Sequence, residues 1–181
     1  MGATERASSS AALLVPDGRA LPFRPVTKIG TTSARNLLTT PLAVWERDGL
    51  KTALLKAGLP ADDVEQPGLL FWRYESSADI PAGFGGLEIY RSDALLRSVV
   101  TLPPLRRMGI GGGIVTMLEG EARALKCQTM YLVTTSETRF FGRLGYAACD
   151  RSVVPDAIGR SSHFGRLWCA NGTVMLKQVS P

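Results

Sequence analysis

A glycine-rich segment that joins a strand pattern to a helical pattern is the feature that most constrains the fold of this chain. The mainly apolar run Leu95–Leu102 leads through Pro103 and Pro104 into Arg106–Gly113, which reads RRMGIGGG. Apolar residues then recur at helical spacing over 110–126, so we expect an amphipathic helix packed on a sheet. Glycines let the backbone approach phosphate oxygens, and a helix start offers unpaired N–H donors. The order of these parts favours a diphosphate site over an ordinary turn.

Two common nucleotide-binding loops do not fit this segment. A P-loop places Gly-Lys-Ser/Thr at the helix start, where this chain has Gly111-Gly112-Gly113 followed by Ile and Val. A dinucleotide fold needs Gly-x-Gly-x-x-Gly near the start of a βαβ unit, and the glycines here do not match that spacing. We therefore expect neither nucleotide hydrolysis nor nicotinamide binding.

The segment resembles the coenzyme A loop of the GNAT acetyltransferase family, Gln/Arg-x-x-Gly-x-Gly/Ala, which follows the fourth strand in that family. The likeness continues with an apolar strand at 130–135, a short helix around 137–144 and the turn into Gly145-Tyr146. It implies an α/β (α+β) fold with a mixed, mostly antiparallel central sheet flanked by helices. It also implies an N-acetyltransferase with acetyl-CoA as cosubstrate and no metal. The residues assigned to cofactor binding are Val99, Val100, Thr101, Arg106, Arg107, Met108, Gly109, Ile110, Gly111, Gly112, Gly113 and Phe141.

A narrower likeness is to the GNAT proteins often encoded in bacterial arsenic-resistance operons. It is carried by the motifs at 58–60, 86–88, 95–98, 134–135 and 140–141, and by residues of the tail. The tail departs from that subgroup where Cys-Pro becomes Cys169-Ala170. The likeness implies detoxification of a small amine, including an arsenic-containing amino-acid analogue, in arsenic or xenobiotic resistance.

The residue at position 141 leaves a second function open. Many GNAT enzymes have a tyrosine there that is thought to protonate the coenzyme A thiolate, and this chain has Phe141. Phenylalanine cannot donate a proton, although a thiol pKa of about 8.5 makes the thiolate a tolerable leaving group that water can protonate. The alternative to an enzyme is a coenzyme A-binding regulatory or interaction module with weak turnover.

Two strands carry the candidates for the chemistry, which must take a proton from the amine. Glu88 is the first candidate base, because strand alternation places its carboxylate on one face with Gly86 and Tyr90. An ion pair between Glu88 and Arg97 of the next strand is an equally weighted structural alternative. Arg97 is also a candidate ligand for the carboxylate of an amino-acid substrate. Ser98 is a weaker catalytic candidate.

The chain length and composition favour one catalytic domain. Residues 1–32 show no sustained period and are predicted to be a mobile extension, so the domain covers 33–181. No stretch has the length of a secretory signal core or a membrane span, and we expect a cytosolic protein. The net charge is +5, and its most obvious concentration is the pair Arg106-Arg107. The sequence has no basic helix interleaved with aromatic residues, so we expect no nucleic-acid partner. We expect a monomer or homodimer whose partner is a small-molecule amine.

Capping and turn residues predict the remaining elements. A first helix is expected from Thr40 as N-cap and Pro41 as first residue to Gly58, with Leu42, Trp45, Leu54 and Leu55 buried. Strands are expected at 35–38, 69–74, 83–90 and 95–102, the last two joined by a turn at 91–93. In the short helix, Ser136 is predicted to cap the start and Gly145 to end it.

The cysteines and the single histidine carry little functional signal. Cys127, Cys149 and Cys169 form no Cys-x-x-Cys pair, and we favour structural roles over a three-thiolate arsenic site. His163 is predicted to be a surface or packing residue, because one histidine provides no zinc cluster or shared histidine triad.

Overall fold

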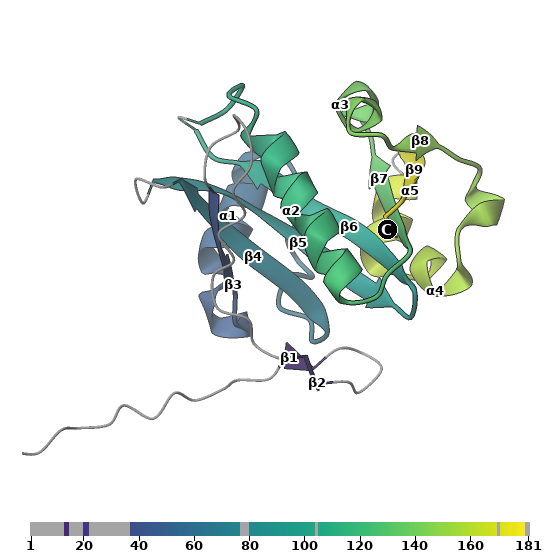
Figure 1. Ribbon diagram of the computed structural model, residues 1–181, viewed down its shortest axis with the longest axis horizontal. Helices are drawn as coiled ribbons and strands as arrows, with labels where there is room; N and C mark the ends of the chain where they lie inside the picture. The colour runs from purple at the N-terminus through teal and green to yellow at the C-terminus, as the bar shows by residue number, and fades with distance from the viewer. Residues whose placement is uncertain are drawn as a thin grey trace, which may run out of the picture.

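A seven-stranded mixed sheet forms the centre of the computed structural model (Figure 1). The structure describes residues 13–14, 20–21, 37–76, 80–103, 105–169 and 171–179. The sheet order is β3-β4-β5-β6-β7-β9-β8. Its strands are β3 (Leu37–Pro41), β4 (Leu69–Ser76), β5 (Pro81–Tyr90), β6 (Asp93–Thr101), β7 (Thr129–Thr134), β8 (Ala147–Ala148) and β9 (Thr173–Gln178).

The pairing within this sheet is antiparallel except at its middle. Strands β3 to β6 form an antiparallel meander, and β9 pairs antiparallel with both β7 and β8. Strand β6 runs parallel to β7, and their ladder covers only Asp93–Leu95 against Thr129–Tyr131. The predicted mixed, mostly antiparallel sheet is therefore confirmed, and its one parallel pair is short.

Helices cover both faces of the sheet. On one face, Ile114 and Leu118 of α2 (Ile110–Ala124) share a core cluster with Leu87 of β5. On the other face, α1 (Asp48–Lys56) packs against β4, where Phe71 belongs to its cluster. The helices α4 (Asp156–Gly159) and α5 (Ser162–Cys169) cover β7 and β9 there, whereas α3 (Thr138–Arg143) follows β7.

The close packing of α2 on β5 depends on a glycine. A Cβ at Gly85 would lie 2.6 Å from Cδ1 of Leu118, which real side chains do not tolerate. Strand alternation sends Leu87 to the α2 face and Glu88 to the α1 face. The helix therefore lies directly on β5 and β6, and its N-terminal end is held at a fixed place beside β6.

The predicted start of the first helix is wrong. Thr40 and Pro41 lie in β3, where they pair with Arg73 and Trp72 of β4. Proline is tolerated there because β3 is an edge strand and Pro41 is its last residue. A 3₁₀ turn at Val44–Glu46 intervenes, and α1 begins at Asp48.

The later helix start changes which residues are buried. Leu42 and Leu54 are buried as predicted, but Trp45 is 82% exposed and Leu55 is 63% exposed. Leu50 and Ala53 form the inner face instead. The predicted stop is confirmed, because Gly58 follows α1 with a left-handed φ of +69°.

The short helix α3 ends as predicted and begins differently. Gly145 adopts a φ of +89° just beyond it. Ser136 is not its cap: Glu137 is the N-cap residue, and its N–H donates to Oγ1 of Thr134 at 3.0 Å. The hydroxyl that holds this helix start therefore comes from the end of β7.

The predicted N-terminal extension lies almost wholly outside the described residues. Within it, residues 13–14 and 20–21 pair as two short antiparallel strands, β1 and β2. Among the residues that the structure places, no helix is long and apolar enough to cross a membrane.

Candidate functional site

A β-bulge in β6 opens the sheet. Gly86 pairs with Arg97 and Phe84 pairs with Val100, so Ser98 and Val99 together oppose one residue of β5. Ser98 has a φ of +54°, a conformation that costs a non-glycine residue about 1–3 kcal/mol. Bulges bend a strand, and the ladder to β7 has already ended at Leu95. The two central strands therefore diverge from this point onward.

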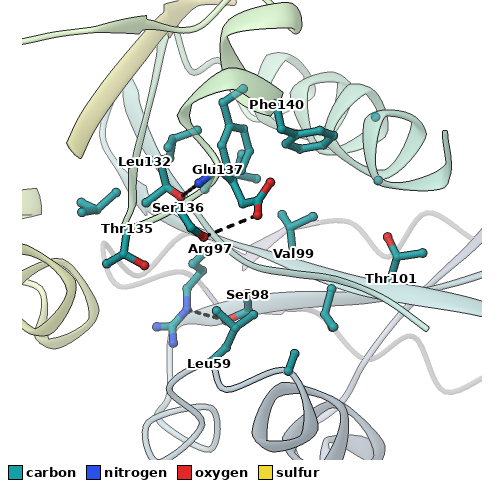
Figure 2. Close-up of a pocket in the computed structure, with 18 of the residues that line it drawn as sticks. Leu59, Arg97, Ser98, Val99, Thr101, Leu132, Thr135, Ser136, Glu137 and Phe140 are labelled. Atoms are coloured by element: carbon teal, nitrogen blue, oxygen red, sulfur yellow. Dashed lines mark hydrogen bonds between the residues drawn. The ribbon is translucent and has the colours of Figure 1, made fainter. Parts of the chain in front are cut away.

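A cavity of about 990 Å³ occupies the divergence. Its walls come from β6, the start of α2, the segment after β7 and α3, together with the end of α1 and α5. Figure 2 shows Glu137 and Phe140 on one side of it and Arg97, Ser98 and Leu59 on the other. Because α2 and α5 cover opposite faces of the sheet, the cavity is lined from both faces.

The start of α2 forms one end of the cavity. Gly109 is the N-cap residue, and its φ of +79° favours glycine. A Cβ at Gly111 would come within 3.3 Å of Cζ of Phe140 and 3.4 Å of Oγ1 of Thr101. The guanidinium of Arg106 donates from Nε to the Thr101 carbonyl at 3.1 Å, which fixes its stem beside the helix. This end combines helix N–H donors with cations, as an anionic ligand requires.

Most of the predicted cofactor residues line this cavity. Gly113 does not, because its α-carbon faces Leu37 of β3, whose Cδ1 would lie 3.1 Å from an added Cβ. Met108 and Glu88 are also absent from the wall. The predicted residues that do line it are Arg97, Ser98, Val99, Val100, Thr101, Arg106, Arg107, Gly109, Ile110, Gly111, Gly112 and Phe141.

Sequence reasoning missed the wall residues that come from other elements. The hydroxyl-bearing run that follows β7 had a usable signal, since it lies at the end of a strand next to the glycine-rich helix. The residues from α1 and α5 had none, because the fold brings them in from distant parts of the chain. The missed residues include Lys56, Leu59, Pro60, Thr134, Thr135, Ser136, Glu137, Phe140, Arg143, His163 and Leu167.

Arg97 is the centre of a buried charge cluster beside the cavity. Its side chain is 1% exposed, and Nη1 donates to Oε1 of Glu88 at 2.6 Å. Nη2 donates to Oδ1 of Asp63 at 2.6 Å, and Nε donates to Oγ of Ser98 at 3.2 Å. The predicted Glu88–Arg97 ion pair is confirmed. The second oxygen of Glu88 accepts from the Tyr90 hydroxyl at 2.6 Å, so both carboxylate oxygens are engaged.

Asp63 links this cluster to α5. Its Oδ2 accepts from the Ser162 hydroxyl at 3.2 Å and lies 3.1 Å from Nη2 of Arg166. Arg166 also pairs with Asp62. Burial alone would raise the pKa of Asp63, but the hydrogen bond and charge of Arg97 outweigh it and hold that pKa below its usual value. The segment after α1 is thus tied to α5 by ionised groups.

His163 stands in the cavity wall in a neutral form. The residue is 4% exposed, and Nδ1 is buried with no hydrogen-bond partner. Burial, and then the charge of Arg97, lower the pKa of His163 to about 3. The ring is therefore a packed residue, as predicted, but it also faces the site.

Phe141 lies between the cavity and the core. Its ring is 9% exposed and meets Phe140 edge-on at 4.9 Å and Tyr146 at 5.9 Å between centroids. Burial raises the pKa of Tyr146, whose hydroxyl contacts Sδ of Met130 in the core. Tyr146 is absent from the cavity wall, so it does not replace the missing phenol at position 141.

The described residues contain no group of three or more His, Cys, Asp or Glu side chains that could hold a metal ion. Cys127 packs in the core beneath α2, and Cys149 packs with the cluster on the opposite face. The Cys169 side chain lies outside the described part of the structure. The two thiols that the structure places are therefore in separate clusters.

The profile of the Acetyltransferase (GNAT) family matches residues 33–146, which is more than half of the chain. No curated protein sequence matches this chain significantly.

Three solved structures illustrate the similarity in fold. A GNAT-family acetyltransferase from Staphylococcus aureus aligns with a TM-score of 0.63 at 14% identity, covering 80% of this chain and 99% of that chain. A Mycobacterium tuberculosis protein in complex with coenzyme A aligns with a TM-score of 0.59 at 22% identity, covering 77% of this chain and 98% of that chain. An aminoglycoside 6′-N-acetyltransferase complexed with coenzyme A aligns with a TM-score of 0.57 at 19% identity, covering 79% of this chain and 97% of that chain. The chain therefore belongs to the GNAT family and is an acetyl-CoA-dependent N-acetyltransferase.

Proposed function

We propose that this enzyme acetylates the primary amino group of a small molecule with a compact apolar body. The observation that carries the proposal is the cavity between β6 and β7, which is lined from both faces of the sheet. Such a site lets two reactants enter from opposite ends and meet at the bulge of β6. Holding them in line supplies much of the rate enhancement that a transfer without a covalent intermediate needs.

The α2 end fits acetyl-CoA. The N–H groups at Gly109–Gly112 and the charges of Arg106 and Arg107 would hold its diphosphate. The exposed edge of β6 at 99–101 has no ladder partner in β7 and offers backbone groups to an extended amide-containing arm. Acetyl-CoA supplies the thioester: the amine nitrogen attacks its carbonyl carbon, the C–S bond breaks, the nitrogen loses a proton and the thiolate gains one.

The opposite end fits the acceptor. Leu59, Pro60 and Leu167 give it apolar walls, and His163 is uncharged. Substrate binding by Arg97 stays a prediction that this geometry does not favour, because its donors already serve Glu88, Asp63 and Ser98. Lys56 is exposed and lines the cavity, so it is better placed to pair with an acceptor carboxylate.

Of the two catalytic candidates, Ser98 lines the cavity and Glu88 does not. Glu88 as a general base stays a prediction, and its contacts support a positioning role for it through Arg97. Ser98 lines the cavity, and its Oγ accepts from Arg97, which leaves the hydroxyl proton free to be donated toward the reactants. We propose Ser98 as the polar group of β6 that touches the reacting atoms.

The role in arsenic resistance rests on the motif resemblance alone, so an arsenic-containing amino-acid analogue is one acceptor to test. A coenzyme A-binding module with weak turnover is the second candidate function, and Phe141 favours it because it brings no proton donor to the cavity.

A thiol-release assay with the full chain tests the proposal. Acetyl-CoA is offered with L-phenylalanine, L-methionine, benzylamine, spermidine, kanamycin and an arsenic-containing amino-acid analogue, and products are identified by mass spectrometry. We expect amine-dependent release of coenzyme A with the compact apolar amines and a product carrying one acetyl group. Tight acetyl-CoA binding without turnover on any amine would favour the regulatory module instead.

A further inference from the structure

We propose that His163 is an acceptor-binding residue, whose imidazole hydrogen-bonds to the amino group of the acceptor at the end of the cavity away from α2. The proposal rests on the proposed acetyl transfer to a small amine. It assigns a contact to a residue outside 33–146, the region that the family profile covers.

The position of the ring supports this role. His163 is the second residue of α5, and Leu167 follows it by four positions, so both lie on one helix face. Both residues line the cavity. Helix α5 covers the sheet face opposite α2, and the acceptor is expected on that side.

The missing partner of the ring supports it independently. Nearly all buried polar atoms in proteins have a hydrogen-bond partner, and an exception calls for an explanation. Nδ1 of His163 has no partner although the residue is buried, with only 4% of its surface exposed. Because His163 lines the cavity, a polar substrate bound there is the partner that we assign to this ring.

The charges around the ring fit an amine in its reactive form. Arg97 from β6, Arg166 from α5 and Asp63 from the segment after α1 face His163, and burial with the two arginines keeps the ring neutral. A neutral imidazole has one nitrogen lone pair that can accept an N–H. An amine held in this way directs its own lone pair elsewhere, toward the thioester. The apolar residues Leu59 and Leu167, which line the same cavity, disfavour the ammonium form, which cannot attack.

Steady-state kinetics with the full chain test the contact. His163→Gln and His163→Ala are compared with Arg160→Ala, which removes an exposed side chain of the preceding turn. We expect the KM for the best panel amine to rise about threefold to tenfold in His163→Ala, as loss of one hydrogen bond predicts. The KM for acetyl-CoA should stay unchanged, and His163→Gln should retain part of the affinity. Unchanged amine KM in both folded His163 variants would overturn the proposal.

The wild-type protein offers a second test that needs no variant. His163 is the only histidine of the chain, so its ring signals in an NMR spectrum are assigned once any purification tag is removed. We expect coenzyme A alone to leave these signals in place and a panel amine added to the coenzyme A complex to shift them. If none of the panel amines shifts them, the contact does not exist. The NMR shift reports binding and does not depend on acetyl transfer. Absence of turnover together with such a shift would therefore contradict the proposed function and not the contact.

Discussion

At the scale of single residues, Arg97 shows how one buried cation organises the acceptor side of the site. Its guanidinium holds Glu88 and Asp63, and its Nε fixes the Ser98 hydroxyl at the bulge. Removing one partner from a buried ion pair leaves the other charge uncompensated, which is more costly than the loss of an exposed pair. The cluster therefore both stabilises the fold and fixes the geometry of β6.

Glu88→Gln tests whether this carboxylate acts on the proton or on Arg97. Because both of its oxygens are hydrogen-bonded, we expect a loss of about 1–3 kcal/mol in the free energy of unfolding, with acetyl-CoA affinity unchanged. The matched control is Glu65→Gln, since Glu65 pairs with Lys51 at the surface and should change little. Denaturant titration and calorimetry measure both. A normal unfolding midpoint with a large fall in kcat would instead identify Glu88 as the general base.

At the scale of elements, the acceptor side depends on the link between the segment after α1 and α5. Arg166 bridges Asp62 and Asp63, and Ser162 also reaches Asp63. These contacts hold Leu59 and Leu167, from the two elements, in one cavity wall.

Arg166→Ala should loosen this wall. We expect a higher KM for the amine, with the KM for acetyl-CoA unchanged because the start of α2 does not depend on the link. Arg160→Ala is the matched control: Arg160 pairs with Asp156 at the surface, where the two side chains are 80% and 90% exposed. Equal effects of the two substitutions on the amine KM would show that the link does not shape the acceptor side.

The elements also show what the sequence could predict. The glycine-rich start of α2 and the Glu88–Arg97 pair were predictable, because they depend on a local pattern and on two strands joined by a tight turn. The contact of Ser162 with Asp63 joins residues 99 positions apart, so no local pattern indicates it. The Thr40-Pro41 pair has the chemistry of a helix start, yet tertiary pairing in an edge strand overrides it.

At the scale of the whole molecule, His163 makes the free energy of unfolding depend on pH between about 3 and 6.5. Its pKa is lowered to about 3 by burial and by Arg97 and Arg166, against the partial opposition of Asp63, whereas an unfolded histidine titrates near 6.5. Between these values the unfolded state binds one more proton, so acid favours unfolding. The stabilising contribution is complete above pH 6.5 and is lost progressively as the pH falls toward 3.

We therefore expect the free energy of unfolding to fall by about 2 kcal/mol between pH 8 and pH 5 because of this group. Urea titrations at a series of pH values measure it, with His163→Gln as the comparison. The variant should show a flatter profile over this range, whatever its absolute stability. Parallel profiles for wild type and variant would show that His163 is not held neutral.

The proposed function depends above all on the binding of acetyl-CoA at the start of α2, and calorimetry on two valine variants of this helix measures that binding. Gly111 faces Phe140 and Thr101 in the cavity wall, whereas Gly120 of the same helix has nothing within 4 Å of an added Cβ. Gly111→Val and Gly120→Val make the same chemical change in α2, so their common effects on helix stability cancel. We expect Gly111→Val to weaken acetyl-CoA binding by about tenfold or more, which is the loss expected when about 1.4 kcal/mol of contact is removed, and Gly120→Val to bind acetyl-CoA like wild type. Equal, undiminished affinity in both folded variants would contradict binding at the start of α2.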